Sequence, residues 1–491
     1  MRIVRAIASV LVIACGGHGN DEPPPSSTVI RDPVSTTPSP PTPTVTQPDY
    51  PDWTRSLELK RTVGVRLEPG DDAKPIGNIA VDTRVGWTRV AQARGCDRPW
   101  VEIKPRGWVC GKYLEPSRKP PNGQEVPHLD RGELVPGIYG KVTAPSSVTY
   151  ALEKPEKKKQ PKDHKKKKGP VTSTKDSTDD DVPAKPKMVE DKPLVGSVNV
   201  RQYDELTLDG KSYWKIAQKE NQYVLSQAIT KHVPSHYAGT RLGDDTGWAL
   251  PIAFVWPRGG MYAAYTTNTA KGGGVARQLM QRTPIAVLET DNADKPTAYR
   301  IGEREWIAAA DVRVFRAAPP PPMLMPGERW IDVDVDSEIL VALEGDVAVY
   351  ATMVSSGGKD TPTETGVYRM WRKESEADMK GLNGEDPYSV ATVPWTQFFS
   401  PEKGLALHTA YWHDGFGRPR SHGCVNLAPR DARWLYFWSD PQVPPGWTMA
   451  AGVVELPGSV VRIRSKDDPS PEAKGYAKKV LEARQQNAPA H

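Results

Sequence analysis

The string Ser421-His422-Gly423-Cys424-Val425-Asn426 follows Leu407-His408-Thr409-Ala410 after a short interval, and together they indicate a reactive thiol beside an imidazole. A thiol attacks a carbonyl carbon only as thiolate, and a free cysteine has a pKa of about 8.5. An imidazole within hydrogen-bond reach can take that proton and later return it to a leaving amine. His408 is expected on a strand, and the intervening chain is long enough to fold back. We therefore predict that Cys424 is a nucleophile and His408 its base.

A glycine stands directly before this cysteine. Because glycine lacks a Cβ, the backbone can approach a substrate closely there, and the N–H groups of Gly423 and Cys424 could point at a developing oxyanion. The polar surroundings argue against Cys424 as an inert buried cysteine. Ser421 as a serine nucleophile is a weaker hypothesis than the thiol three residues later.

The segment upstream of these strings has the pattern of antiparallel strands. Polar and apolar residues alternate from Arg329 to Val335, and apolar runs follow at Ile339 to Leu343 and Val347 to Tyr350. Glu344-Gly345-Asp346 is the expected turn between the last two. Asp332, Asp334 and Asp336 are expected to face solvent. This part of the chain is predicted to be mainly β.

The histidine, the spacer and the Ser-His-Gly-Cys-hydrophobic-Asn string resemble the signature of the L,D-transpeptidase (YkuD-type) family. The resemblance extends from Trp330 to Arg464 and includes Ser355-Ser356-Gly357, Thr361 to Gly366 and Ala432-Arg433-Trp434-Leu435. It implies a β-sandwich catalytic domain with Cys424 as nucleophile and His408 as base. It also implies that the backbone carbonyl of Thr409 orients His408, while Ser421, His422 and Asn426 shape the loop.

The resemblance further implies a reaction and its substrate. The cysteine would attack the L-centre carbonyl of the third residue of a peptidoglycan tetrapeptide stem, expel D-alanine and pass the acyl group to a second stem's amine. The product would be a 3-3 crosslink. Water as acceptor would give carboxypeptidase activity, and a protein amine would give anchoring to the wall. The family usually reacts with carbapenems, and neither cofactor nor metal is implied.

Zinc binding is the alternative for the same residues, because His and thiolate are zinc ligands. His408, His413, His422 and Cys424 would be the candidates, but their spacing fits no common closed zinc pattern. Trp412, Trp434 and Trp438 are expected to be core or cleft wall.

The N-terminus predicts export. Arg2 and Arg5 precede an apolar run from Ala6 to Ala14, which is too short to span a bilayer and has the shape of a signal peptide. The string Val12-Ile13-Ala14-Cys15-Gly16 resembles the bacterial lipobox, so Cys15 is predicted to carry a lipid anchor. An ordinary signal peptide with a chance cysteine is the alternative. The residue after Cys15 is not the aspartate of inner-membrane retention, which favours the outer membrane.

The other cysteines fit an oxidising compartment. Cys96 and Cys110 lie close together in one small β-type segment and are predicted to pair as a disulfide. Cys424 is left as an odd thiol, for which reactive chemistry is one reason.

Composition divides the chain. Its 491 residues are 37% hydrophobic and include 49 prolines, whereas about 45–50% apolar, glycine included, is usual, so long solvated segments are expected. Three segments resemble bacterial SH3-like units, each with a tryptophan near its end, and such units bind cell wall or serve as spacers. The predicted divisions are a signal peptide at 1–15, a Pro/Ser/Thr-rich linker at 16–52, SH3-like units at 53–117, 118–238 and 239–318, a proline hinge at 319–324, the catalytic domain at 325–465 and a tail at 466–491. A lysine-rich disordered insertion at 154–192 interrupts the second unit.

Charge argues against one class of partner. The net charge is only +5, and the lysines are clustered rather than interleaved with aromatics, so nucleic-acid binding is not expected. Two hypotheses of different classes remain: an L,D-transpeptidase, and a wall-binding lipoprotein whose catalytic domain is vestigial. The intact His408 and Cys424 favour the enzyme.

Overall fold

The computed structural model describes residues 45–46, 50–144, 147–153, 186–315, 317–381 and 387–486. Residues Pro43–His491 form one compact unit. The predicted signal peptide, Cys15, nearly all of the linker and residues 154–185 of the predicted insertion lie outside the described residues. Within the described part, no helix is long and apolar enough to cross a membrane.

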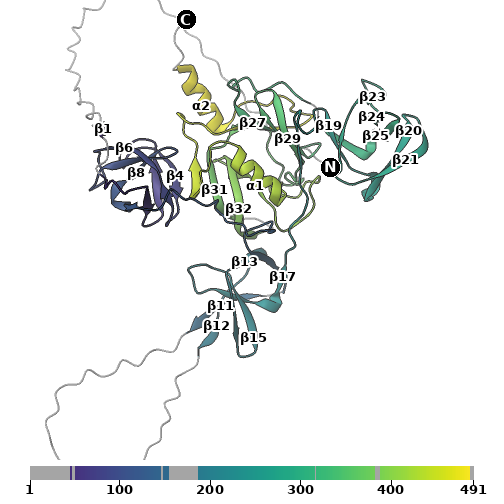
Figure 1. Ribbon diagram of the computed structural model, residues 1–491. Helices are drawn as coiled ribbons and strands as arrows, with labels where there is room; N and C mark the ends of the chain where they lie inside the picture. Colours follow the sequence, from purple (N-terminus) through teal and green to yellow (C-terminus); the bar gives the residue numbers. More distant parts are fainter. Residues whose placement is uncertain are drawn as a thin grey trace, which may run out of the picture. The chain divides into compact units, whose positions relative to one another are not determined.

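The described chain is mainly β, as predicted (Figure 1). Its two α-helices are α1 (Pro429–Trp438) and α2 (Gly475–Gln486), and short 3-10 turns occur at η1 (Gly111–Tyr113), η2 (Ser226–Ala228), η3 (Arg258–Gly260) and η4 (Ala309–Asp311).

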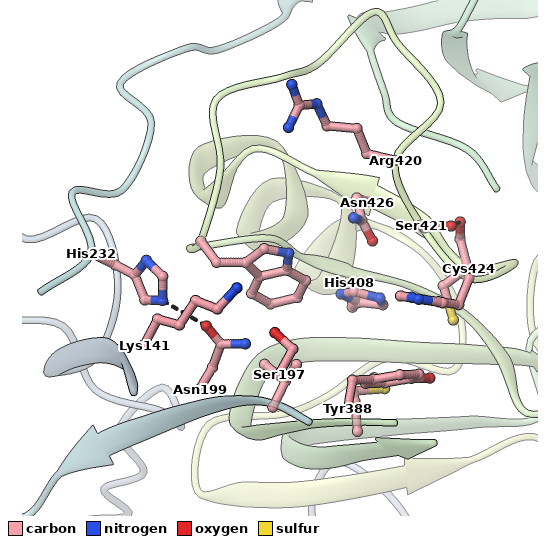
Figure 2. A pocket seen from close by; sticks show the side chains of 14 residues that line it. Lys141, Ser197, Asn199, His232, Tyr388, His408, Arg420, Ser421, Cys424 and Asn426 are labelled. Atoms are coloured by element: carbon pink, nitrogen blue, oxygen red, sulfur yellow. Dashed lines mark hydrogen bonds between the residues drawn. The ribbon is translucent and has the colours of Figure 1, made fainter. Parts of the chain in front are cut away.

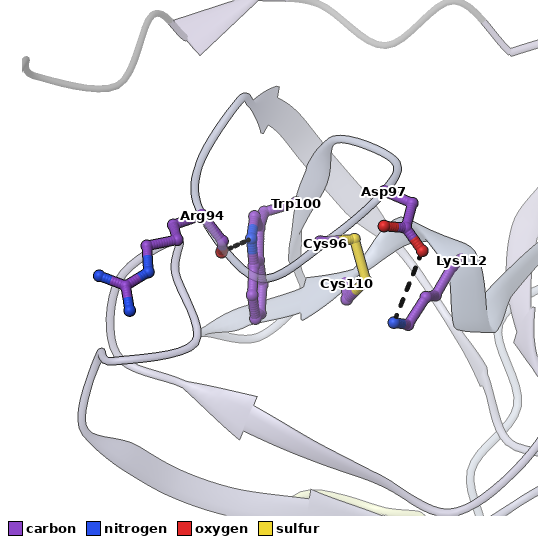
Figure 3. Close-up of a disulfide and its surroundings, with 6 residues drawn as sticks. All are labelled: Arg94, Cys96, Asp97, Trp100, Cys110 and Lys112. Atoms are coloured by element: carbon purple, nitrogen blue, oxygen red, sulfur yellow. Dashed lines mark hydrogen bonds and ion pairs between the residues drawn. A yellow bond between two sulfur atoms is a disulfide. The ribbon is translucent and has the colours of Figure 1, made fainter.

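The first β region spans residues 56–117, with a two-residue strand, β1 (Val45–Thr46), paired to its β6. Its strands are β2 (Ser56–Leu59), β3 (Val63–Arg66), β4 (Pro75–Ile79), β5 (Arg84–Val85), β6 (Trp87–Ala91), β7 (Trp100–Ile103), β8 (Trp108–Cys110) and β9 (Leu114–Ser117). Alternate residues such as Leu57, Val65 and Val101 are buried in one core. Cys96 and Cys110 are joined by a disulfide, with their Cα atoms 5.7 Å apart (Figure 3). The predicted pairing is therefore present.

The second β region spans residues 138–231. Its strands are β10 (Ile138–Val142), β11 (Val148–Glu153), β12 (Lys187–Pro193), β13 (Ser197–Gln202), β14 (Asp204–Leu208), β15 (Lys211–Lys215), β16 (Tyr223–Leu225) and β17 (Ile229–Lys231). All of strand β12 except Pro193 lies within the segment predicted as a disordered insertion. It is ordered because it pairs antiparallel with β11, for example Tyr150 with Glu190.

The third β region spans residues 252–315. Its strands are β19 (Ile252–Val255), β20 (Ala263–Thr269), β21 (Gly272–Met280), β22 (Pro284–Ala286), β23 (Glu289–Thr290), β24 (Ala298–Gly302), β25 (Glu305–Ala308) and β26 (Val312–Phe315). These strands form two sheets. The preceding strand β18 (Thr240–Arg241) instead pairs with β29 (Val347–Met353) of the C-terminal region.

The C-terminal region contains two sheets that share one core. One sheet has the order β18-β29-β28-β27-β36-β30. Besides β29, the strands of this region are β27 (Arg329–Asp334), β28 (Ile339–Glu344), β30 (Gly366–Arg369), β31 (Arg372–Gly381), β32 (Tyr388–Ser400), β33 (Leu405–Thr409), β34 (Val425–Leu427), β35 (Trp447–Ala451) and β36 (Val460–Arg464). Ile331 and Leu340 of the first sheet pack in the same cluster as Trp395 and Leu407 of the second. Burial of each such side chain contributes about 1.5–3 kcal/mol.

The three strands expected at the start of this region are present. Strands β27, β28 and β29 pair antiparallel in sequence order. The turn between β28 and β29 is Gly345-Asp346, with Gly345 at φ 60°. Glycine suits this turn because left-handed backbone costs it no Cβ clash.

The expectation that Asp332 faces solvent is wrong. Its side chain is 1% exposed and bonds to Arg462 and Arg464. The cause is the parallel pairing of β27 with β36, which sets Asp332 opposite Arg462. A polar–apolar alternation cannot reveal that a distant strand supplies counter-charges on the polar face.

The segment predicted as a tail contains an ordered helix. Helix α2 buries Ala477 and Val480 and packs beside β30. Arg484 of this helix pairs with Glu328 at 3.4 Å. The last part of the chain described by the structure therefore belongs to the C-terminal region.

Candidate active site

Two short parallel strands bring the predicted residues together. Strand β33 pairs with β34 so that His408 lies opposite Asn426. Cys424 directly precedes β34. His408 and Cys424 consequently line the same cavity, which has a volume of about 220 Å³ (Figure 2).

His408 is held in one orientation. The ring is buried, and its Nδ1 lies 2.9 Å from the carbonyl oxygen of Thr409, the contact expected from the sequence. Because a carbonyl only accepts hydrogen bonds, Nδ1 must carry the proton, so Nε2 keeps its lone pair. Burial lowers the pKa of His408 to about 4. The imidazole is thus neutral at physiological pH and can accept a proton at Nε2.

Cys424 is a protonated thiol in this arrangement. Burial raises its pKa to about 11, and the backbone of Ala406 acts weakly in the opposite direction. Its Sγ lies 3.9 Å from the carbonyl oxygen of Gly404. The pair therefore rests as neutral thiol and neutral imidazole rather than as an ion pair, and attack requires proton transfer to a base.

The turn that carries the thiol is closed by Ser421. Its hydroxyl donates to the carbonyl of Cys424 and accepts from the N–H of Gly423 at 3.1 Å. The predicted oxyanion role of the Gly423 N–H is therefore not seen, because that N–H is already donated to Ser421. Gly423 itself is needed for its conformation, with φ at +120° and a Cβ position 3.1 Å from Leu405.

Asn426 and His422 occupy different surroundings. The side-chain amide of Asn426, which is buried, contacts His413 Nε2 at 3.1 Å. His422 is exposed and stacks on Tyr388, with ring centroids 4.5 Å apart. Each side chain thus contacts a ring outside the Ser421–Asn426 string.

The Ser355-Ser356-Gly357 string supports the thiol loop through hydrogen bonds. The N–H groups of Arg420 and Ser421 donate to the carbonyl of Ser356, and Glu338 accepts from the Ser356 N–H and hydroxyl. Burial raises the pKa of Glu338 to about 7. The Ser355-Ser356-Gly357 string therefore acts through the loop backbone.

Several cavity residues escaped the sequence-based prediction. They are Lys141, Ser197, Asn199, His232, Met379, Tyr388, Val390 and Arg420. Three of them, Lys141, Ser197 and Asn199, come from the second β region, and His232 directly follows it, far upstream of the catalytic strings. The one local feature of the sequence that could have indicated a site is the polar Asn199 between the buried Val198 and Val200, and it does not indicate what kind of site this would be. Trp412 lines the cavity as expected.

The zinc alternative gains no support. Among the described residues, no group of three or more His, Cys, Asp and Glu side chains is arranged to hold a metal ion.

Comparison with known proteins finds a family match for the C-terminal region. Residues 328–463 match the family model described as the L,D-transpeptidase catalytic domain, YkuD. The match covers the C-terminal region alone.

Individual relatives cover only parts of the chain. L,D-transpeptidase 2 of Mycobacterium tuberculosis (strain CDC 1551 / Oshkosh) is 30% identical over 118 residues, which are 22% of this chain and 29% of the relative. The chain thus spans under a third of that relative's length. Among solved structures, an Enterococcus faecium L,D-transpeptidase mutant is 25% identical and covers 28% of this chain and 50% of its own, with a TM-score of 0.23. L,D-transpeptidase 3 of Mycobacterium tuberculosis is 17% identical, and the match covers 33% of this chain and 73% of that structure's chain, with a TM-score of 0.23. These TM-scores add no argument beyond the family match.

Proposed function

We propose that the chain is a cell-wall L,D-transpeptidase that forms 3-3 crosslinks through Cys424. The main support for this proposal is the neutral His408. Its Nδ1 is held by the carbonyl of Thr409, which leaves Nε2 to act as base in the cavity that Cys424 also lines. The family match of residues 328–463 supports the proposed substrate class, tetrapeptide stems of peptidoglycan.

The reaction proceeds by two acyl transfers. His408 Nε2 takes the Cys424 proton as Sγ attacks the L-centre carbonyl of the third stem residue. The tetrahedral intermediate collapses to a thioester, and the departing D-alanine amine takes the proton from His408. The amine of a second stem then attacks the thioester, His408 accepts its proton, and that proton returns to the departing sulfur.

The cell-wall setting is part of this proposal. The signal-type N-terminus and Cys15 would export the chain and anchor it by a lipid, in the outer membrane in preference to the inner one. The β regions before residue 325 would act as SH3-like wall-binding units or as spacers. There are two alternative reactions of the same thioester: hydrolysis, and transfer to a protein amine. A third alternative is a non-catalytic lipoprotein that binds the cell wall.

Product masses test the proposal. The chain and its Cys424→Ala variant are incubated with purified disaccharide-tetrapeptide. A dimer that lacks one D-alanine, formed only by the unmodified protein, supports transpeptidation. Tripeptide without dimer would replace the amine acceptor by water. Absence of both products would leave the wall-binding lipoprotein as the better account.

A further inference from the structure

One sheet face continues from the second β region to the thiol site. Lys141 on β10 lies directly opposite Asn199 on β13, and Asn199 lies opposite Val390 on β32 in a parallel pair. Ser197 lies opposite Tyr388 in the same pair. Residues directly opposite on neighbouring strands project to the same face. All five line the cavity that contains Cys424 and His408.

The upstream part of this face presents hydrogen-bond donors. Asn199 is 6% exposed, and its Oδ1 lies 2.7 Å from His232 Nε2. Because that oxygen only accepts, Nε2 of His232 carries the proton, and the Asn199 amide nitrogen is directed into the cavity (Figure 2). Burial, with the nearby charge of Lys141, lowers the pKa of His232 to about 4, so this imidazole is neutral. The positive charge here is that of Lys141.

The charges around the cavity select the ligand. Lys141 and Arg420 are among its lining residues, and none of the described residues that line it is Asp or Glu. Figure 2 shows Lys141 and Arg420 on different sides of His408. A cavity with two cations, amide and hydroxyl donors and no carboxylate suits an anionic ligand. A peptide stem carries carboxylates.

We propose that Lys141, with Asn199 and Ser197, binds a carboxylate of the peptide stem beside Cys424. This inference rests on the proposed transpeptidase function. None of these three residues lies within residues 328–463. The second β region is therefore a part of the substrate site, and the catalytic domain without it lacks one binding group.

Steady-state kinetics of the full chain test this role. Lys141→Met should raise KM for disaccharide-tetrapeptide by about 10- to 100-fold, the range of a hydrogen bond to a charged group, with a smaller change in kcat. Lys141→Arg should restore most of the affinity, because it keeps the charge. Lys211→Met, at an exposed position of β15, is the matched control and should leave KM unchanged.

Amidated substrates identify which carboxylate is bound. Amidation of either the terminal D-alanine carboxylate or the side-chain carboxylate of the diamino acid should raise KM for the unmodified chain. In the Lys141→Met variant, amidation of the carboxylate that Lys141 binds should cause no further rise in KM. If amidation raised KM by the same factor in the Lys141→Met variant as in the unmodified chain at both positions, the proposal would be overturned.

A binding measurement separates this inference from the function. Calorimetry with tetrapeptide uses the Cys424→Ala chain with and without Lys141→Met. A Kd weakened by Lys141→Met supports the carboxylate site even if the unmodified chain turns over no substrate, a result that would overturn only the transpeptidase proposal. Unchanged KM and Kd in the Lys141→Met chains would overturn the Lys141 proposal and leave transpeptidation standing.

Discussion

At the scale of single residues, the site rests in an uncharged form. Burial holds the pKa of His408 near 4 and that of Cys424 near 11, so between these values neither group is ionised. A preformed thiolate–imidazolium pair would need the opposite order of pKa values. In the proposed reaction the proton therefore moves during attack on the substrate, and the fixed Nδ1 contact with Thr409 keeps the accepting nitrogen available.

This charge state predicts the pH dependence of alkylation. Because the thiol loses its proton only near pH 11, the rate of Cys424 carbamidomethylation by iodoacetamide should rise about tenfold per pH unit from pH 6 to 10 without a plateau. The rate is followed by intact mass, and Cys424→Ala gives the background. A plateau beginning below pH 7 would show an ion pair instead.

That Cys424 and His408 lie at one cavity was predictable from the sequence, but their hydrogen bonds were predictable only in part. The string around Cys424 and the distant His408 indicate the chemistry directly. The donation of the Gly423 N–H to Ser421 could not be foreseen, because it depends on the Ser421 rotamer in a closed turn. Lys141 and Asn199 could not be assigned either, since nothing local links them to a thiol far along the chain.

At the scale of elements, the pairing of β33 with β34 sets the geometry. Their parallel register brings His408 beside Asn426 and starts β34 directly after Cys424. Helix α1 follows at Pro429, a residue suited to the first helical position. Its Asp431 accepts from Tyr350, Thr352 and the N–H of Gly239, which fixes the helix against β29.

The turn before β34 gives a prediction for Gly423→Ala. A φ of +120° and the close Leu405 make any Cβ unfavourable, at a cost of about 1–3 kcal/mol. We expect the turn to shift and carbapenem acylation of Cys424 to slow at least tenfold while the protein stays folded, as measured by mass spectrometry and thermal unfolding. Gly327→Ala, with positive φ but open space around it, should keep the acylation rate. Equal rates in both variants would contradict the account.

Strand order was predictable where partners are adjacent in sequence. The β27–β28–β29 meander follows from alternation and the Gly345 turn. The β27–β36 pair was not predictable, because it joins segments more than a hundred residues apart. Asp332 was misassigned to solvent for this reason.

At the scale of the whole molecule, the predicted divisions are joined by shared sheets. Strand β4 of the first region pairs with β35, β13 of the second with β32, and β18 with β29. Composition marks Pro- and Lys-rich segments but cannot show that edge strands of one region extend the sheet of another. Regions that resemble separate units in the sequence thus contribute to one structure and, at Lys141, to one cavity.

The disulfide predicts a local effect on stability. Cys96 and Cys110 close a loop with a sequence separation of 14, and loss of the crosslink should destabilise the first β region by about 3 kcal/mol. Hydrogen exchange should accelerate in β6, β7 and β8 of the Cys96→Ala/Cys110→Ala variant. The rate of carbapenem acylation at Cys424 should stay within twofold, since the disulfide lies outside the cavity. A large fall in that rate would show that the first region supports the site.

The acyl-enzyme is the most direct test of transpeptidation through Cys424. The full chain is mixed with disaccharide-tetrapeptide, quenched in acid at short times, digested and mapped by tandem mass spectrometry. The account predicts a thioester of the disaccharide-tripeptide on Cys424, accumulating without acceptor and discharged when a second stem is added. It should be absent from Cys424→Ala and strongly reduced in His408→Gln. An acyl group on another residue, or crosslinked product from the Cys424→Ala chain, would contradict the account.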